Sequence, residues 1–158
     1  MYFSILKGIQ IRVEFLKSED IYSFIRCAQE IELQEANQVK GKKIKWFVSS
    51  DESWVVEKIK NEISNSSNKT TEKVFGFKGK IGHVLFDEKA YERAILDVEL
   101  LGRCDRLVLT GGSTFGFVAA FKSGRRPYFV DGWRQMKKCA LFDFSAPSRR
   151  PTGEAVFK

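Results

Sequence analysis

The stretch from Leu107 to Ala120, LVLTGGSTFGFVAA, most constrains what this chain can fold into. An apolar run ends in two glycines, which are followed by Ser-Thr and then by small and apolar residues that can form a helix. This order predicts a buried parallel strand, a tight turn and a helix N-terminus. Gly111 and Gly112 let the backbone approach a ligand closely, and Ser113 or Thr114 can cap the helix. A helix N-terminus presents free N–H groups and a positive dipole end, which together hold phosphate.

Two interpretations of this turn stay open from the local pattern. The Walker spacing GxxxxGK[ST] and its lysine are missing, and the dinucleotide fingerprint GxGxxG does not occur here either. The turn is therefore either a phosphate site of another kind or an ordinary strand–helix connection with a capped helix.

Strand-like and helix-like segments alternate along the chain, which predicts an α/β fold. We expect a Rossmann-like parallel sheet of about five strands with right-handed crossovers and helices on both faces. Residues 1–132 are assigned to this domain and residues 133–158 to an irregular C-terminal tail. The expected strands are 3–13, 44–48, 74–77, 106–110 and 127–130. The expected buried helix faces are Ile21, Phe24, Ile25, Ala28 and Ile31, then Val55, Val56, Ile59 and Ile63, then Tyr91, Ile95, Val98 and Leu101.

Ligands of such sheets bind beyond the carboxyl ends of the strands. This rule brings together Arg12, residues 49–51 and the turn at 111–115, three regions that lie far apart in the sequence. Arg12 ends a very apolar strand, where its guanidinium can donate two hydrogen bonds to a phosphate. The alternative for Arg12 is a strand-end side chain that extends to water. Asp51 and Glu52 stand at a helix start, where capping and dipole compensation are the favoured roles.

Two further residues carry open alternatives. Asp97 lies near the edge of the predicted buried face of its helix. Its carboxylate can accept hydrogen bonds from the N1–H and N2–H donors of guanine, or it can lie on a solvated face beside Arg93. His83 is the one histidine of the chain. It is a candidate phosphate ligand or acid/base group, although a lone loop histidine usually serves as neither.

Composition narrows the class of protein. The 158 residues, 43% of them hydrophobic, suit one domain, and the net charge of +7 suits a phosphate-bearing partner as well as it suits an ordinary basic protein. No aromatic-interleaved basic stripe, metal cluster, Ser-His-Asp set or membrane-length apolar run occurs, so nucleic-acid binding and hydrolysis have no specific support. The cysteines at 27, 104 and 139 form no CxxC motif, and Cys27 and Cys104 lie in apolar patterns typical of buried free thiols. Two glycosylation sequons start at Asn65 and Asn68.

Two motifs in this order resemble a known family. The segment Gly8–Val13, GIQIRV, resembles the GIQIR strand of the plant cell-wall fucosyltransferases and is similar to the H-x-R strand of α1,2-, α1,6- and protein O-fucosyltransferases. The segment from Arg93 through Cys104-Asp105 to Ala119 resembles their second block, ALxExxLLSxSDxLLTSxxSTFGYVA. The similarity covers about residues 5–131, and Gln10 replaces the more widespread histidine, as in the plant group.

The resemblance implies a glycosyltransferase with a GT-B fold, of which this chain is the C-terminal, GDP-fucose-binding half. By the same resemblance, Arg12 grips the β-phosphate, Ser113, Thr114 and Phe115 contact the diphosphate and ribose, and Asp97 recognises guanine. The family inverts configuration at fucose and uses no metal or other cofactor. The expected partners are GDP-fucose and a glycan acceptor. The expected location is the Golgi or secretory lumen, with membrane attachment only through segments outside this chain. The alternatives are a non-catalytic nucleotide- or phosphate-binding domain, a fragment of a larger glycosyltransferase, or a basic interaction module.

Overall fold

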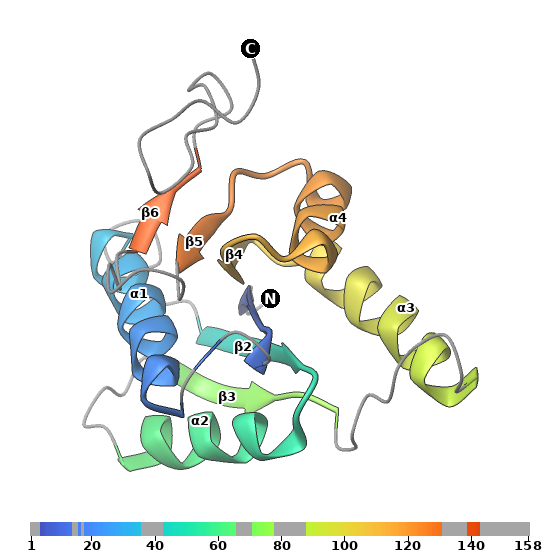
Figure 1. Ribbon diagram of the computed structural model, residues 1–158. Helices are drawn as coiled ribbons and strands as arrows, with labels where there is room; N and C mark the ends of the chain where they lie inside the picture. The colour runs from blue at the N-terminus through green and yellow to red at the C-terminus, as the bar shows by residue number, and fades with distance from the viewer. Residues whose placement is uncertain are drawn as a thin grey trace.

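A parallel sheet with one antiparallel edge strand forms the centre of the molecule (Figure 1). The computed structural model describes residues 4–13, 16, 18–35, 43–65, 71–77, 88–130 and 139–142. Within these residues the strand order is β3-β2-β1-β4-β5-β6. The strands are β1 (Ser4–Ile11), β2 (Lys43–Ser50), β3 (Thr71–Phe75), β4 (Arg106–Thr110), β5 (Tyr128–Val130) and the antiparallel β6 (Cys139–Leu141). The helices are α1 (Ile21–Gln34), α2 (Ser53–Asn65), α3 (Glu88–Gly102) and α4 (Thr114–Ser123).

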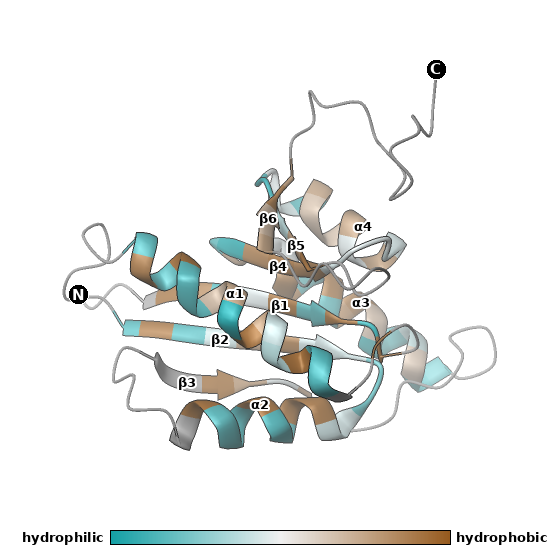
Figure 2. Cartoon of the chain, turned by 60° about the vertical axis from the view of Figure 1, so that its left-hand side comes forward, coloured by the Kyte–Doolittle hydropathy of each residue, from teal (hydrophilic) through white to brown (hydrophobic). Residues whose placement is uncertain are grey.

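Helices cover both faces of this sheet, as the alternation predicted. One hydrophobic cluster joins α1 and α2 to one face through residues such as Phe24, Ile59 and Ile9. A second cluster joins α3 and α4 to the other face through Leu101, Ala119 and neighbouring strand residues. Both α1 and α2 carry hydrophobic and hydrophilic residues in alternation (Figure 2), and every residue predicted for their buried faces is buried. The predicted α/β fold class is confirmed.

The strand–turn–helix unit around residue 111 is also confirmed. β4 ends at Thr110, and α4 begins at Thr114 with Ser113 as its N-cap. The Ser113 hydroxyl accepts a hydrogen bond from the Gly116 N–H at 3.3 Å. Gly112 adopts a φ of 79°, and nothing lies within 4 Å of the position of a Cβ there. Backbone conformation rather than space therefore favours glycine at this turn.

Several element details differ from the sequence-based expectation. α1 begins at Ile21 after a 3-10 turn (Ser18–Asp20), and its N-cap is Asp20 rather than Ser18. β3 occupies Thr71–Phe75, about three residues earlier than expected. On α3, Tyr91 and Ile95 are exposed, because the buried positions of this helix are Ala90, Asp97 and Leu101. Hydrophobic periodicity cannot identify a buried face that includes a paired carboxylate, and the predicted α3 face was therefore wrong at these positions.

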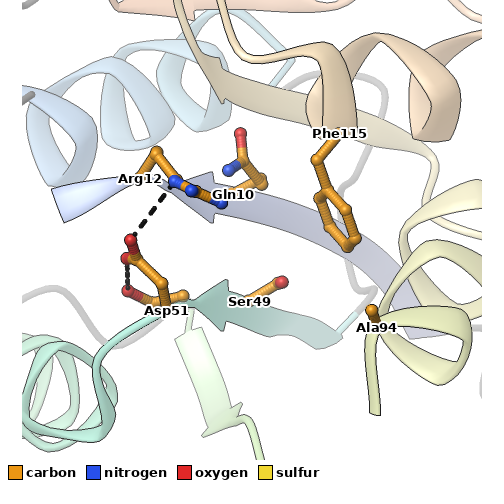
Figure 3. Close-up of a pocket in the computed structure, with 7 residues that line it drawn as sticks. Gln10, Arg12, Ser49, Asp51, Ala94 and Phe115 are labelled. Carbon is orange, nitrogen blue, oxygen red and sulfur yellow. Dashed lines mark hydrogen bonds and ion pairs between the residues drawn. The ribbon is translucent and has the colours of Figure 1, made fainter. Parts of the chain in front are cut away.

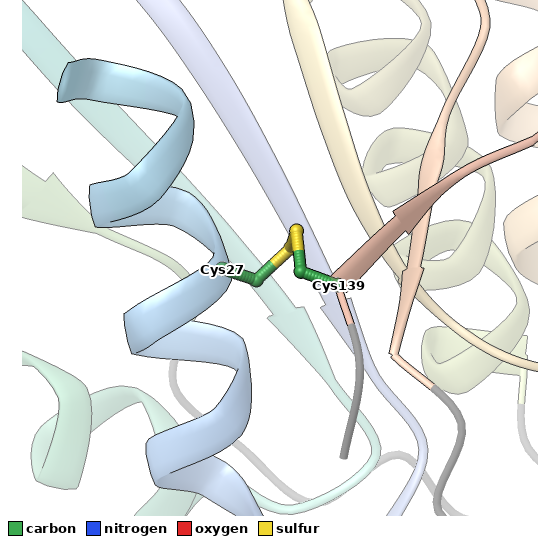
Figure 4. Close-up of a disulfide and its surroundings, with 2 residues drawn as sticks. All are labelled: Cys27 and Cys139. Atoms are coloured by element: carbon green, nitrogen blue, oxygen red, sulfur yellow. A yellow bond between two sulfur atoms is a disulfide. The ribbon is translucent and has the colours of Figure 1, made fainter. Parts of the chain in front are cut away.

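A disulfide ties the sheet edge to the first helix. Cys27 of α1 bonds to Cys139 of β6 across a sequence separation of 112 residues (Figure 4). The expectation of a free thiol at Cys27 was wrong, because the fold brings a cysteine from the expected irregular tail against α1. β6 itself was not predicted, and it extends the sheet within that segment. Cys104 is a buried free thiol, as expected.

Candidate functional site

An open pocket lies at the carboxyl edge of the sheet (Figure 3). Four separate parts of the chain reach it: the end of β1, the end of β2, the middle of α3 and the first turn of α4. This is the convergence that the sheet-edge rule predicted for Arg12, residues 49–51 and the 111–115 turn. The lining residues are Gln10, Arg12, Ser49, Ser50, Asp51, Ala94 and Phe115.

Strand alternation explains why four of the lining side chains, those of Gln10, Arg12, Ser49 and Asp51, share one face. Gly8 of β1 faces the α3/α4 cluster, since a Cβ added there would meet side chains of Leu107, Cys104 and Leu101. Side chains two residues apart on a strand point the same way, so Gln10 and Arg12 follow Gly8. On β2, Phe47 belongs to the α3/α4 cluster. Ser49 and Asp51 follow it by the same rule.

Arg12 and Asp51 form the charged side of the pocket. The Arg12 Nε lies 3.4 Å from Oδ2 of Asp51, and the two side chains are 41% and 21% exposed. The other Asp51 oxygen, Oδ1, accepts the backbone N–H of Val13 at 2.9 Å. Asp51 therefore fixes the chain segment that follows β1, while the guanidinium stays accessible from the pocket.

The three residues that the resemblance assigned to the diphosphate and ribose, Ser113, Thr114 and Phe115, lie in different environments. Phe115 lines the pocket, and its ring lies toward Ala94 of α3 (Figure 3). Ser113 is buried as the cap of α4, and Thr114 is exposed at the first position of the helix. The pocket thus has an apolar wall from Phe115 and Ala94 opposite the charged pair.

Asp97 is fully buried behind Ser49. Its Oδ2 accepts a hydrogen bond from Ser49 Oγ at 2.6 Å, and its Oδ1 accepts one from Arg93 Nε at 3.0 Å. Arg93 also donates to the carbonyl of Phe77 and stacks over that ring at 4.7 Å. Burial raises the pKa of Asp97, and the bonds from Ser49 and Arg93 oppose that rise. The alternative of a solvated face is wrong, because the side chain has no exposed surface. Recognition of guanine by Asp97 stays a prediction.

His83 lies outside the described residues, so its role stays a prediction. Gln10 and Ala94 line the pocket although neither was proposed as a site residue. Gln10 could have been found from its spacing of two residues before Arg12 on one strand. Ala94 carries no chemical signal in the sequence.

Two kinds of feature are absent from the described ranges. There, no group of three or more His, Cys, Asp or Glu side chains is arranged to hold a metal ion. Among the helices of that part of the chain, none combines the length and apolar character needed to cross a membrane.

Comparisons with solved structures identify similar folds. A mutant of Arabidopsis thaliana FUT1 in complex with GDP matches with a TM-score of 0.60 and 19% identity over 87% of this chain. NodZ, an α-1,6-fucosyltransferase co-crystallised with GDP, matches with a TM-score of 0.54 and 16% identity over 81% of it. NodZ soaked with GDP-fucose gives a TM-score of 0.53 and 16% identity over 89%. No protein-family model and no curated protein matches the sequence.

These matches cover this chain well but cover the solved proteins only in part. The chain spans 32% of the FUT1 chain and 38% to 42% of the NodZ chains. It has the fold of one Rossmann-like half of a GT-B protein. The matched structures therefore show the fold of this chain, and it is the fold that the motif resemblance implied.

Proposed function

We propose that the pocket binds GDP-fucose and that the chain is the donor-binding half of an inverting fucosyltransferase. The observation that carries the proposal is the convergence of Arg12, the β2 end and Phe115 in one pocket at the carboxyl edge of the sheet. Nucleotides bind at this edge in open α/β sheets, where the strand order reverses. Here β1 lies between β2 and β4, which places the reversal beside Arg12. The similar structures were solved with GDP or GDP-fucose.

The chemistry of the pocket suits a nucleoside diphosphate. Arg12 offers a planar cation for the diphosphate, and the N-terminus of α4 supplies a positive dipole end nearby. Phe115 and Ala94 form an apolar wall suited to a sugar or base face. Departure of GDP from fucose builds negative charge on the β-phosphate, and a fixed arginine stabilises that charge in the transition state. On this proposal no covalent nucleophile, metal or cofactor takes part.

The further parts of the proposal concern the whole enzyme. A glycan hydroxyl is the proposed acceptor of fucose. The Golgi or secretory lumen is the proposed location. The disulfide between Cys27 and Cys139 supports an oxidising compartment, because such bonds are rarely maintained in the cytosol.

Calorimetric titration of the purified chain with GDP, ADP, UDP and GDP-fucose tests donor binding. We expect GDP and GDP-fucose to bind and ADP and UDP to bind more weakly. No binding of GDP would refute the proposal. The competing function, a nucleotide-binding domain without transferase activity, is separated by a second assay. The chain, supplied with an acceptor-binding half, is incubated with GDP-fucose and a glycan acceptor, and release of GDP is measured. GDP binding without turnover in that assay favours the non-catalytic alternative.

A further inference from the structure

We infer that Gln10 donates a hydrogen bond from its side-chain amide to the diphosphate of the bound nucleotide. This role rests on the function proposed above. Gln10 lies near the end of β1, is 3% exposed and lines the pocket. It shares its strand face with Arg12, about 7 Å further along the strand.

The orientation of the Gln10 amide is set by the backbone of β4. The N–H of Thr110 donates to Oε1 of Gln10 at 3.4 Å, a long hydrogen bond. A backbone N–H cannot accept, so the amide must present its oxygen, and not its nitrogen, to Thr110. Figure 3 shows the oxygen and nitrogen of this amide pointing apart, with the nitrogen on the side of Arg12.

The first turn of α4 confines the same amide. A Cβ added at Gly116 would lie 2.9 Å from Oε1 of Gln10, closer than side-chain carbons normally approach. Gly116 therefore leaves the space that the amide oxygen occupies. With Thr110 on one side and α4 on the other, the Oε1 position is fixed.

The amide nitrogen is left for a ligand. In the part of the chain that the structure describes, no residue accepts a hydrogen bond from Nε2 of Gln10. Because Nε2 is not fully enclosed by protein, a ligand in the pocket can accept its hydrogen bond in place of solvent. The non-bridging oxygens of a diphosphate are strong acceptors, and a diphosphate held by Arg12 brings them to this strand face. The sugar hydroxyls of the donor are the other acceptors within reach, and the test separates the two.

Gln10 also differs from a charged donor in a useful way. It adds no charge beside Arg12, so the two side chains do not repel each other. It does not titrate, so the contact is constant across the pH range in which a histidine would change charge.

The experiment compares GDP with GDP-fucose in folded variants. Gln10→Met removes the donor with an unbranched side chain of similar size, and Gln10→Glu replaces the donor by an anionic acceptor. Gln34→Glu, at the exposed end of α1, is the matched control for the charge change. Affinities are measured by calorimetry, and folding by circular dichroism and thermal melting.

We expect Gln10→Met to lower the affinities for GDP and for GDP-fucose alike by about 10- to 100-fold, which is the range for loss of a hydrogen bond to a charged group. Gln10→Glu should weaken both at least as much, and Gln34→Glu should change neither. If Gln10→Met does not fold, Gly116→Ala is used in its place. The Cβ of the new alanine would displace the Gln10 amide and should lower the affinities for both GDP and GDP-fucose.

Three other results would overturn the inference. Unchanged affinities in a folded Gln10 variant would refute the role of Gln10 while leaving the proposed function intact. Weaker binding of GDP-fucose alone would assign the donor to the sugar and refute the diphosphate contact. Absence of GDP binding by the unmutated chain would refute the proposed function itself, and this inference with it.

Discussion

The backbone N–H of Arg12 donates to the hydroxyl of Thr110 at 2.9 Å, although 98 residues separate the two. The same hydroxyl donates to the carbonyl of Gln10 at 3.1 Å. Arg12 follows the last residue of β1, so Thr110 extends the pairing of β1 with β4 by one side-chain bridge. The hydroxyl therefore holds the backbone of both pocket residues on β1.

Thr110→Val tests how much this bridge contributes to stability and to nucleotide binding. Valine matches the shape of threonine but leaves the Arg12 N–H and the Gln10 carbonyl without their partner. An unsatisfied buried group costs about 1–3 kcal/mol, so the free energy of unfolding should fall by about that much, and GDP should bind more weakly. Urea denaturation and calorimetry measure the two effects. Thr110→Ser, which keeps the hydroxyl, should retain most of the stability and most of the affinity for GDP. Equal losses of stability and affinity in the two variants would contradict a role for the hydroxyl.

Replacement of Arg12 tests the charged side of the pocket. Arg12→Ala should lower the affinity for GDP by about 10- to 100-fold, because a charge-assisted hydrogen bond to phosphate is lost. In an enzyme supplied with its acceptor half, Arg12→Lys should lower kcat by about 10²- to 10³-fold with a smaller change in KM, since lysine lacks the planar fork. Arg26→Ala, on the exposed side of α1, is the control for charge alone. Near-normal binding and turnover in both Arg12 variants would make Arg12 an ordinary strand-end residue.

Asp97 is best tested by comparing two nucleotides. If its carboxylate accepts hydrogen bonds from guanine, Asp97→Asn should lower the affinity for GDP by about 10-fold or more and leave the affinity for ADP unchanged. If Asp97 serves only to hold Ser49 and Arg93, both nucleotides should lose affinity together. Ser49→Ala, which removes one of the two internal bonds to Asp97, provides the matched variant. Equal affinity of the unmutated chain for GDP and ADP would remove the guanine assignment.

The disulfide should contribute strongly to stability. It closes a loop of 112 residues between α1 and β6. In the chain-entropy model a loop of about 100 residues gains about 4–5 kcal/mol from such a bond. Cys27→Ala combined with Cys139→Ala should therefore lower the free energy of unfolding by several kcal/mol, as measured in urea. Reductant should destabilise the unmutated chain and leave the double variant unaffected. An unmutated chain insensitive to reductant would contradict this prediction.

Lys7 should give the stability a dependence on alkaline pH. Its side chain is 2% exposed, and its Nζ lies 3.6 Å from Oε2 of Glu35. Burial lowers the pKa of Lys7 below 10.5, against the opposing effect of Glu32 and Glu35. Between the lowered pKa and 10.5 the folded protein binds fewer protons than the unfolded chain, so stability rises with pH there. That gain is lost as the pH falls through the lowered pKa.

Lys7→Met should remove this rise. The free energy of unfolding is measured in urea at several pH values below 10.5 for both proteins, and the unmutated chain should gain stability relative to the variant as the pH increases. Burial raises the pKa of Cys104 to about 12, an effect that both proteins share and that cancels in the difference. Parallel pH profiles would show that Lys7 does not titrate differently on folding.

Much of the architecture could be predicted from the sequence, because it depends on local patterns. The apolar run that ends at Thr110, the turn at Gly112 and the cap at Ser113 specify a strand, a reversal and a helix start within a few residues. The sheet-edge rule then places Arg12 beside the 111–115 turn, since parallel strands end on the same side. Strands β1 and β4 lie near their expected ranges for these reasons.

Only the tertiary structure decided which side chains meet across the chain. Whether Cys27 is a free thiol depends on where β6 joins the sheet, which no local pattern specifies. Asp97 is buried and Tyr91 is exposed, because Ser49 and Arg93 satisfy a carboxylate for which the helix pattern left a solvated face and a ligand contact open. The direction of the Gln10 amide follows from the Thr110 N–H and the space at Gly116, two contacts about 100 residues away. The sequence determines the strands, turns and helices through short-range preferences, whereas burial and hydrogen bonding between distant residues determine the chemistry of the pocket.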